Sequence, residues 1–379
     1  MAKKEFCLKN SNILFFTNVM RQGGTERVIL QMCKILKDCV NKIYVCSSGG
    51  DSVKQLELMG IEHITVSDIE SKSPVKILRN LRFLKNLIKE KQIDIIHSHH
   101  RMAAFFVRLA GQTKKKIHFV NVHNTFYNKK RLTRFAYKNA QIFAVGEKVK
   151  ENLLRFYNLP ENRVYVLRNA VEPFDGEVTP LKVIEDFKER GCKFICNVGR
   201  LTEQKGMEYF IRSLPLVKKA VPDVKYLIAG DGDLRDYLHG LANSLDLNQD
   251  VIFLGYRTDI RNIMAQCDLV VLSSLWEGLP LTPIEAFSVK KTIVATAVDG
   301  TVEVVNDGVN GLLVTPENSQ AIAEKVIRVC QDAELRNQLE INAFETYREN
   351  FSFEGYSERV LEFYDRFICT GKYKTGKCV

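Results

Sequence analysis

Short apolar runs alternate with amphipathic segments along the first half of the chain. Segments of strand length that contain adjacent apolar residues occur at 12–17, 42–46, 94–100, 117–124 and 141–145. Between them, 27–36 and 74–91 place apolar residues at helical spacing. Buried strands that alternate with helices predict a parallel sheet that is covered by helices on both faces.

The same pattern restarts in the second half. The stretch 173–180 contains Pro, Gly and acidic residues and predicts a linker. Further apolar runs follow at 194–198, 226–229, 251–254, 269–272 and 292–295. A chain of 379 residues also suggests two domains. The sequence therefore predicts an α/β protein with two doubly wound parallel sheets, whose ligands bind beyond the carboxyl ends of the strands in a cleft between the domains.

Composition sets the compartment that we expect. Hydrophobic residues make up 45% and aromatic residues 9% of the chain, which is typical of a globular protein. No apolar run approaches the roughly 20 residues of a membrane span, and the basic N-terminus lacks the apolar core of a signal peptide. We therefore expect a cytoplasmic protein. Its ten cysteines form no Cys-x-x-Cys pair. Those in apolar stretches are predicted to be reduced core residues: Cys7, Cys33, Cys46, Cys196 and Cys267.

Charge is distributed unevenly along the chain, whose formal net charge is +10. Residues 1–175 hold 31 Lys and Arg against 15 Asp and Glu, a charge of +16, whereas the remainder holds 24 against 30, a charge of −6. Between Asp94 and Glu147 there are ten basic residues and no acid. A basic half suits an anionic surface such as phospholipid, or a phosphorylated acceptor. A merely basic surface is the alternative, and no nucleic-acid motif is present.

Two carboxylates flank a tight turn after the apolar run 269–272. Glu277 precedes the turn Gly278-Leu279-Pro280, and Glu285 lies in the helix expected after it. A helix N-terminus suits a phosphate, and a carboxylate suits sugar hydroxyls because it accepts strong hydrogen bonds. The segment therefore predicts a site for a sugar attached to a phosphate.

A structural explanation of the same two acids stays open. Thr282 and Glu285 have the spacing of a capping box, with Pro283 at the first helical position. Glu285 would then bond to the backbone of Thr282 and contact no ligand. For Glu277 the alternative is an ordinary solvated acid in a loop.

Other polar clusters follow strand ends. Arg200 and Lys205 share one loop after 194–198, where two cations can neutralise a diphosphate without a metal; solvated surface cations are the alternative. Gly230 ends the run 226–229, and its loop serves either a ligand or a simple turn. Gly23 and Gly24 precede a helix and form either an anion-binding loop or a plain turn. Neither sheet carries a Gly-x-Gly-x-x-Gly fingerprint, which argues against an NAD-dependent dehydrogenase.

Histidines also gather at strand ends. His97 and His99 share one face of a strand and His100 points elsewhere. No nearby carboxylate or cysteine completes a metal site, so packing at the sheet end or lining of the cleft is favoured over metal binding. His123 ends a later strand, with Asn124 next to it, at a position suited to contact a sugar or a phosphate; a structural role, which is the more common one for a lone histidine, is the alternative. No Ser-His-Asp order and no Walker loop are present.

Taken in order, these segments resemble a family 4 glycosyltransferase of the GT-B fold. The resemblance covers 23–26, 94–99, 166–171, 199–206, 230–232, 277–285, 299–305 and 306–314. It spans most of the chain, and the ordered set is far more specific than any single motif. One departure is Arg168-Asn169-Ala170, where the family usually shows Pro-Asn-Gly at an interdomain turn.

The resemblance implies an architecture. Two facing Rossmann-like domains would enclose a cleft, with 1–175 binding the acceptor and 176–350 binding the nucleotide-sugar donor. A final helix at 351–370 would pack back on the first domain.

The resemblance also implies residue roles. Arg200 and Lys205 would bind the donor diphosphate, Glu285 the ribose hydroxyls, and Glu277 and His123 the transferred sugar; Glu277, His123, Arg200 and Lys205 form the expected catalytic set. The remaining donor-site positions are Gly23, Gly24, Gly230, Gly278, Leu279, Leu281 and Thr282. Gly23 and Gly24 would approach the diphosphate or the acceptor.

The implied activity is transfer of a sugar from a nucleotide-diphosphate sugar with retention of anomeric configuration. We expect a UDP-sugar first and GDP-mannose second, and a lipid-linked or saccharide acceptor in the synthesis of cell-surface polysaccharide or lipopolysaccharide. No metal or other cofactor is expected. Peripheral attachment to the inner face of the membrane is expected, and nucleic acid is not. The competing functions are a nucleotide-sugar epimerase of the same architecture and a non-catalytic module that binds a sugar or a lipid.

Overall fold

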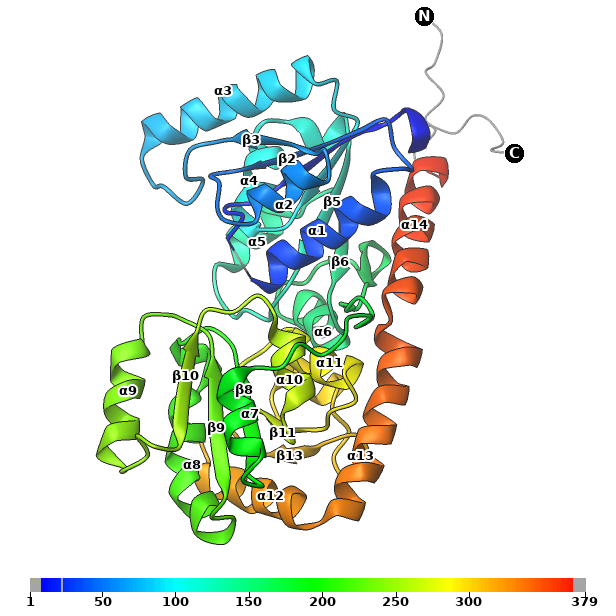
Figure 1. The fold of residues 1–379 in the computed structure, drawn as a ribbon. Coiled ribbons are helices and arrows are strands. Elements are labelled where there is room, and N and C mark those ends of the chain that lie inside the picture. Colours follow the sequence, from blue (N-terminus) through cyan, green and yellow to red (C-terminus); the bar gives the residue numbers. More distant parts are fainter. Residues whose placement is uncertain (1–7, 22, 371–379) are drawn as a thin grey trace, which may run out of the picture. The chain divides into compact units, whose positions relative to one another are not determined.

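The computed structural model describes residues 8–21 and 23–370. The chain forms two compact units, each described here by itself (Figure 1). Unit 1 runs to Asn169 and resumes at Glu354, and unit 2 comprises Ala170–Phe353. The chain thus leaves unit 1 at 169, six positions before the expected boundary of 175, and returns at 354.

Unit 1 is built around a sheet of parallel strands. Its strands are β1 (Asn12–Phe16), β2 (Lys42–Ser47), β3 (Glu62–Thr65), β4 (Ile95–Ser98), β5 (Ile117–Val122), β6 (Gln141–Ala144) and β7 (Val164–Val166). Within the described residues the sheet is seven-stranded, in the order β3-β2-β1-β4-β5-β6-β7. Every neighbouring pair is parallel. Each strand therefore ends at the same edge, where the loops that lead into the helices gather.

The helices of unit 1 cover both faces of this sheet. They are α1 (Gly24–Leu36), α2 (Val53–Leu58), α3 (Pro74–Glu90), α4 (Arg101–Leu109), α5 (Lys130–Ala136), α6 (Glu147–Arg155) and α14 (Phe353–Thr370). One face packs Leu14, Phe16 and Ile96 against α3 and α4. On the other face, Tyr364 of α14 contacts Phe119 of β5, with 4.9 Å between the ring centroids. Figure 1 shows α14 in red at the end of the chain.

Unit 2 repeats this arrangement. Its strands are β8 (Lys193–Val198), β9 (Val224–Ala229), β10 (Val251–Gly255), β11 (Leu269–Leu272), β12 (Ile293–Thr296) and β13 (Leu312–Val314). Its helices are α7 (Lys182–Lys188), α8 (Met207–Ala220), α9 (Arg235–Ser244), α10 (Ile260–Gln266), α11 (Leu281–Ser288), α12 (Ser319–Gln331) and α13 (Ala333–Thr346). The six-stranded parallel sheet has the order β10-β9-β8-β11-β12-β13.

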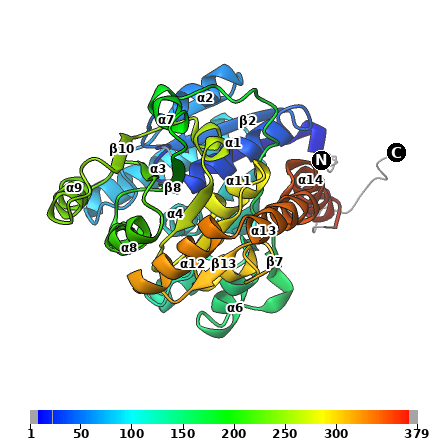
Figure 2. The ribbon, with the colours of Figure 1, turned by 60° about the horizontal axis from the view of Figure 1, so that its bottom comes forward.

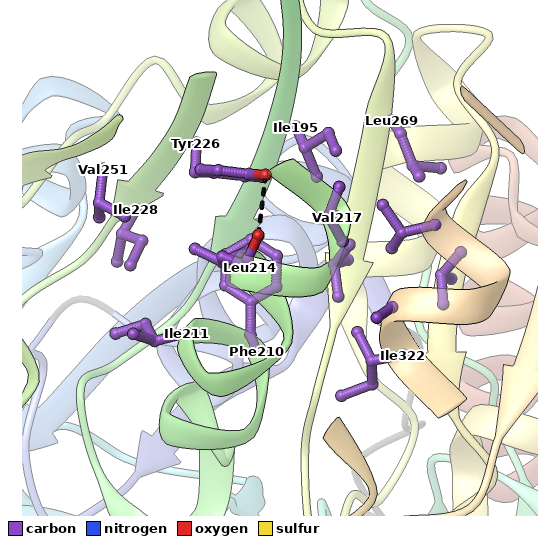
Figure 3. Close-up of a cluster of buried hydrophobic side chains, with 14 of the residues drawn as sticks. Ile195, Phe210, Ile211, Leu214, Val217, Tyr226, Ile228, Val251, Leu269 and Ile322 are labelled. Atoms are coloured by element: carbon purple, nitrogen blue, oxygen red, sulfur yellow. Dashed lines mark hydrogen bonds between the residues drawn. The ribbon is translucent and has the colours of Figure 1, made fainter. Parts of the chain in front are cut away.

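Alternation along the strands divides the core of unit 2 between two faces. Ile195, Leu269 and Val271 belong to one cluster with Phe210 of α8 and Ile322 of α12 (Figure 3). Helices α8 and α12 lie beside each other over this face (Figure 2). The intervening strand residues point to the opposite face because side chains alternate along a strand. The predicted class, an α/β protein with two doubly wound parallel sheets, is confirmed.

Two predictions from composition can be compared with the structure. Within residues 8–21 and 23–370, no helix combines the length and the apolar character that crossing a bilayer requires. Cys33, Cys46, Cys196 and Cys267 are buried free thiols, as predicted. Cys7 lies outside the described residues.

Glycines let the loops at the carboxyl edge of the unit 2 sheet approach one another at backbone distance. A Cβ added to Gly230, after β9, would lie 1.9 Å from the carbonyl oxygen of Gly199, after β8. One added to Gly206 would lie 2.2 Å from the carbonyl oxygen of Ser273, and one added to Gly300 would lie 1.7 Å from that of Gly278. These separations exclude any side chain. A glycine at position 230 is therefore required by the contact between the two loops, independently of any ligand.

Replacing Gly230 with Ala should destabilise unit 2 by at least about 2 kcal/mol, because the new Cβ overlaps backbone and φ is +153°. The matched control is Gly240→Ala in α9, where an added Cβ meets nothing within 4 Å. That change should be neutral or stabilise by up to about 1 kcal/mol, because alanine favours a helix interior. Thermal and urea unfolding measure both effects. Equal stability of the two variants would contradict the backbone contact.

Candidate functional site

The loop after β8 carries the two predicted cations. Gly199 follows the strand with φ +158°, and Gly206 follows the short 3-10 helix Glu203–Lys205 with φ +53°. Both conformations favour glycine, which explains why glycines bracket the loop. The Arg200 side chain is exposed and forms no ion pair or hydrogen bond with a described residue. It is therefore available to an anion at this edge of the sheet.

The loops after β8 and β11 are joined by hydrogen bonds. The Ser273 hydroxyl donates to the carbonyl oxygen of Lys205 at 3.0 Å. The backbone N–H of Leu275 donates to the carbonyl oxygen of Gln204 at 2.8 Å, and the Gln204 amide donates to the carbonyl oxygen of Trp276 at 3.0 Å. These bonds fix the segment that precedes Glu277 against the segment that carries Lys205.

Glu277 and Lys205 form a largely buried ion pair. The Lys205 ammonium lies 2.6 Å from Glu277 Oε1, and the two side chains are 15% and 7% exposed. The Ser274 hydroxyl donates to the same oxygen at 2.6 Å. Oε2 has no partner among the described residues and keeps contact with solvent. A buried carboxylate needs such compensation, so Glu277 is not the solvated loop acid of the structural alternative.

The helix after the turn begins earlier than the capping-box alternative requires. Helix α11 starts at Leu281 with Pro280 as its N-cap residue. Thr282 is therefore the second helical residue, and Pro283 the third, so Thr282 does not occupy the N-cap position that the structural alternative gave it. No side chain of the N-cap residue bonds to the first turn. Free N–H groups and the positive end of the helix dipole therefore lie beside Glu277 in sequence.

The other predicted donor residues of unit 2 lie in or next to this helix. Glu285 and Thr282 are 7% and 8% exposed, and Leu279 is 4% exposed. Leu281 is half-buried. The backbone N–H of Gly300, after β12, points to the carbonyl oxygen of Glu277 at 3.5 Å. Unit 2 thus brings the β8, β11 and β12 loops together around Glu277.

In unit 1, the predicted glycines begin a helix. Gly23 is the N-cap residue of α1 and has extended backbone, and Gly24 is the first helical residue. Glycine has no side chain that could bond to the backbone N–H groups of the first turn. A Cβ on Gly23 would meet only the flexible end of Glu26. Packing therefore does not require a glycine at position 23, in contrast to position 230. An anion-binding loop and a plain turn both remain possible explanations of Gly23.

His97 lies in the core of unit 1 with both ring nitrogens bonded. Nδ1 lies 2.6 Å from the Tyr364 hydroxyl, and Nε2 lies 2.8 Å from Oδ1 of Asn121. Burial lowers the pKa of His97 to about 3, so the ring is neutral at pH 7. A neutral ring whose Nδ1 accepts from the Tyr364 hydroxyl and whose Nε2 donates to Asn121 has a hydrogen-bond partner for both of its nitrogens. This confirms the prediction that His97 packs at the sheet end.

His99 and His123 follow neighbouring strands, β4 and β5, and contact each other. His99 Nδ1 lies 3.1 Å from His123 Nε2. Burial lowers the pKa of His123 to about 4 and holds the pKa of His99 well below its usual range. Both rings are therefore neutral at pH 7.

His100 leaves this cluster, as predicted. It caps α4 and lies 3.3 Å from the Glu70 carboxylate, a neighbour that the sequence did not reveal. Across the described part of the chain, no three His, Cys, Asp or Glu side chains are grouped as metal ligands would be.

The structure therefore assembles the predicted residues in two places. Unit 2 gathers Arg200, Lys205, Glu277 and the start of α11, and unit 1 holds His123 at a strand end. Sequence reasoning missed two partners, Ser274 and His99. The signal for Ser274 was its place between β11 and Glu277. The signal for His99 was the shared carboxyl edge of β4 and β5.

Two family models match the chain. The model described as Glycosyltransferase Family 4 matches residues 22–173, and the model described as Glycosyl transferases group 1 matches residues 182–346. The two matches lie almost wholly in unit 1 and unit 2 respectively. Together they cover most of the chain.

Curated relatives are also glycosyltransferases. An uncharacterized glycosyltransferase of Methanocaldococcus jannaschii is 32% identical over 236 residues, which is 60% of this chain and 60% of that protein. The UDP-Gal:alpha-D-GlcNAc-diphosphoundecaprenol alpha-1,3-galactosyltransferase of Escherichia coli is 27% identical, over 82% of this chain and 85% of its own length. The N,N'-diacetylbacillosaminyl-diphospho-undecaprenol alpha-1,3-N-acetylgalactosaminyltransferase of Campylobacter jejuni is 26% identical, over 89% and 95%.

Solved structures share the fold. A glycosyltransferase of Rickettsia africae superposes with a TM-score of 0.82 at 26% identity, covering 96% of this chain and 99% of that one. Anabaena HepE, solved in complex with UDP-glucose, gives a TM-score of 0.81 at 22% identity, covering 93% and 99%. The GT-B fold that the sequence predicts is thereby confirmed. The chain belongs to the family 4 glycosyltransferases.

Proposed function

We propose that this glycosyltransferase moves a hexose from a UDP-sugar to a hydroxyl of a saccharide carried on a polyprenyl diphosphate, with retention of anomeric configuration. The observation that carries the donor half is the ion pair between Glu277 and Lys205, a lysine in the same loop as Arg200, which has no partner among the described residues. It couples a cation that suits a diphosphate to a carboxylate that suits a sugar. The name of the Escherichia coli relative, which spans most of this chain, supports UDP as the nucleotide.

The proposed chemistry follows from where charge develops. Breaking the anomeric bond leaves an oxocarbenium-like sugar and a diphosphate of growing negative charge. Arg200, Lys205 and the N-terminus of α11 stabilise that charge. Glu277 Oε1 is already engaged by Lys205 and Ser274, so the carboxylate acts as a hydrogen-bond acceptor for the sugar through Oε2. The acceptor hydroxyl attacks from the donor's own face, without a covalent intermediate, and its proton passes to the departing diphosphate on that face.

Nucleotide binding tests the donor site. UDP should raise the melting temperature of the wild-type protein by several degrees at saturating concentration, since a ligand at 100 times its Kd stabilises by about 2.7 kcal/mol. GDP, ADP and CMP should shift it less, and Mg²⁺ should not change the UDP shift. Arg200→Ala should abolish the shift. Arg328→Ala, which removes an exposed arginine from α12, should keep it. A wild-type protein that responds to none of the four nucleotides would contradict the donor assignment.

The role of Glu277 has its own test. Glu277→Gln keeps the shape but removes the charge, and it should lower kcat by about 10²–10³. The UDP melting shift should persist because Arg200 and the α11 N-terminus remain. Glu203→Gln, an exposed acid in the same loop as Lys205, is the matched control and should retain activity. A glycosyl-enzyme trapped on Glu277, detected by mass spectrometry, would replace front-side attack with a double displacement.

The acceptor proposal rests on relatives and on charge. The names of three relatives that span most of this chain specify saccharides on diphospho-undecaprenol. Helix α3 of unit 1 presents an exposed basic face made of Lys76, Arg79, Arg82, Lys85 and Lys89. Val75 and Leu78 on the same helix are 76% and 52% exposed. Basic residues beside exposed apolar side chains suit an anionic bilayer surface, where a lipid-linked acceptor resides.

Vesicle flotation tests this surface. The protein should float with vesicles containing anionic phospholipid at low salt, and much less with neutral vesicles or at high salt. Arg79, Arg82 and Lys85→Ala should weaken binding by roughly 100-fold, at about 1 kcal/mol for each charge. The control replaces three exposed lysines of unit 2, Lys182, Lys188 and Lys219, with Ala. Equal losses in the two triple variants would point to net charge and not to α3.

A further inference from the structure

We propose that His99 is a positioning residue, which holds His123 in the tautomer with its proton on Nδ1 so that His123 meets its ligand as a hydrogen-bond donor. The identity of that ligand, the transferred sugar, rests on the proposed function. The tautomer itself rests on contacts within unit 1.

The two rings come from adjacent strands in fixed register. Strands β4 and β5 pair in parallel, with His97 opposite Phe119 and Ser98 opposite Val120. His99 and His123 follow the ends of these strands, and the backbone N–H of His99 donates to the carbonyl oxygen of Phe16 at 3.0 Å. His99 Nδ1 therefore lies 3.1 Å from His123 Nε2, with the ring planes inclined by 24°. In this contact one nitrogen must donate and the other must accept.

The opposite side of the His99 ring decides which nitrogen donates. His99 Nε2 is sealed from solvent and has no hydrogen-bond partner. The nearby His97 ring, 4.6 Å away between centroids, has both nitrogens engaged by Tyr364 and Asn121 and offers nothing to it. A proton on Nε2 would therefore be an unpaired buried N–H, which is rarer and costlier than an unpaired acceptor. The His99 proton belongs on Nδ1, and it is donated to His123 Nε2.

The position of the His99 proton fixes the tautomer of His123. The ring is neutral at pH 7 because burial depresses its pKa. Its Nε2 accepts from His99, so its single proton lies on Nδ1. Nδ1 forms no hydrogen bond with a described residue and keeps contact with solvent. His123 thus presents one N–H donor and no free lone pair. It can bind an oxygen of the ligand, but it cannot accept a proton as a general base.

Nitrogen NMR of the free, full-length protein tests the tautomer without any activity assay. The chain has seven histidines, and the difference between wild type labelled with ¹⁵N-histidine and His123→Asn identifies the His123 signals. At pH 7 we expect a protonated, pyrrole-type Nδ1 and an unprotonated, pyridine-type Nε2. The reverse pattern, with a protonated Nε2, would overturn the proposal. This result is independent of whether the donor is a UDP-sugar.

Two substitutions at His99 separate positioning from packing. The amide nitrogen of His99→Asn can occupy the place of Nδ1 and donate, so this variant should keep the Nδ1–H form of His123. His99→Leu removes the donor and should shift His123 toward the Nε2–H form. His118→Asn, which removes the neighbouring buried histidine that bonds to Ser98, should leave the His123 signals unchanged. An unchanged tautomer in His99→Leu would contradict the proposal.

Activity gives the second readout. His99→Leu should lower kcat for sugar transfer by about tenfold, the lower end of the effect of losing a partner that orients a functional histidine, and His99→Asn should recover most of it. The pH profile should show no added pKa near 6 in the wild type, because His123 does not act as a base. A chain that shows the expected tautomers but transfers no sugar would retain this proposal and reject the proposed function.

Discussion

The close approach of loop backbones at the carboxyl edge of the unit 2 sheet is the constraint on which the proposed donor site depends. A parallel sheet ends all of its strands at one edge, so the loops must converge there. Gly199 meets Gly230, Gly206 meets Ser273 and Gly278 meets Gly300 at distances that leave no room for a side chain. The shape of the site is therefore set by backbone. The side chains that bear the chemistry, Arg200, Lys205 and Glu277, are placed on a frame that does not depend on their own packing.

A buried carboxylate is the second constraint, and it changes how Lys205 is understood. The sequence assigned this lysine to a diphosphate, whereas the structure pairs it with Glu277 at 2.6 Å. The two roles are compatible because an ammonium has three donors. One donor compensates the carboxylate of Glu277, a residue that is only 6% exposed and therefore needs such a partner. On the proposed reaction, the remaining donors face the phosphate. Lys205 would then contact both Glu277, next to the transferred sugar, and the departing diphosphate. Its positive charge would attract both of these negative groups.

The sequence revealed the elements that have strong periodicity, and it missed those that depend on contacts between distant residues. Apolar residues in segments of strand length predicted β1, β5, β8 and β11, but β3, β7 and β13 have only three or four residues, which is too short for a pattern to identify a strand. The register of α11 was wrong because Thr-Pro-x-Glu is compatible with a cap, whereas the helix starts two residues before Pro283. The sequence did not reveal which side chains pair with Glu277 and His123, because Lys205 and His99 lie 72 and 24 positions away along the chain and come close only when the sheets and their loops assemble.

The two units handle polar groups in opposite ways, and this difference fits the two chemical tasks of a transferase. Residues 1–175 carry a formal charge of +16, yet the side chains buried at the ends of β4 and β5 are neutral imidazoles with depressed pKa values. The positive charge lies instead on exposed surfaces such as α3. Unit 2 is acidic in sum, but it concentrates cations and a helix N-terminus at one edge. A neutral donor suits a sugar hydroxyl, which carries no charge before or after transfer. Cations suit a diphosphate, whose charge grows as the bond breaks. On the proposed function, each unit therefore supplies the kind of hydrogen-bond donor that its own part of the reaction needs.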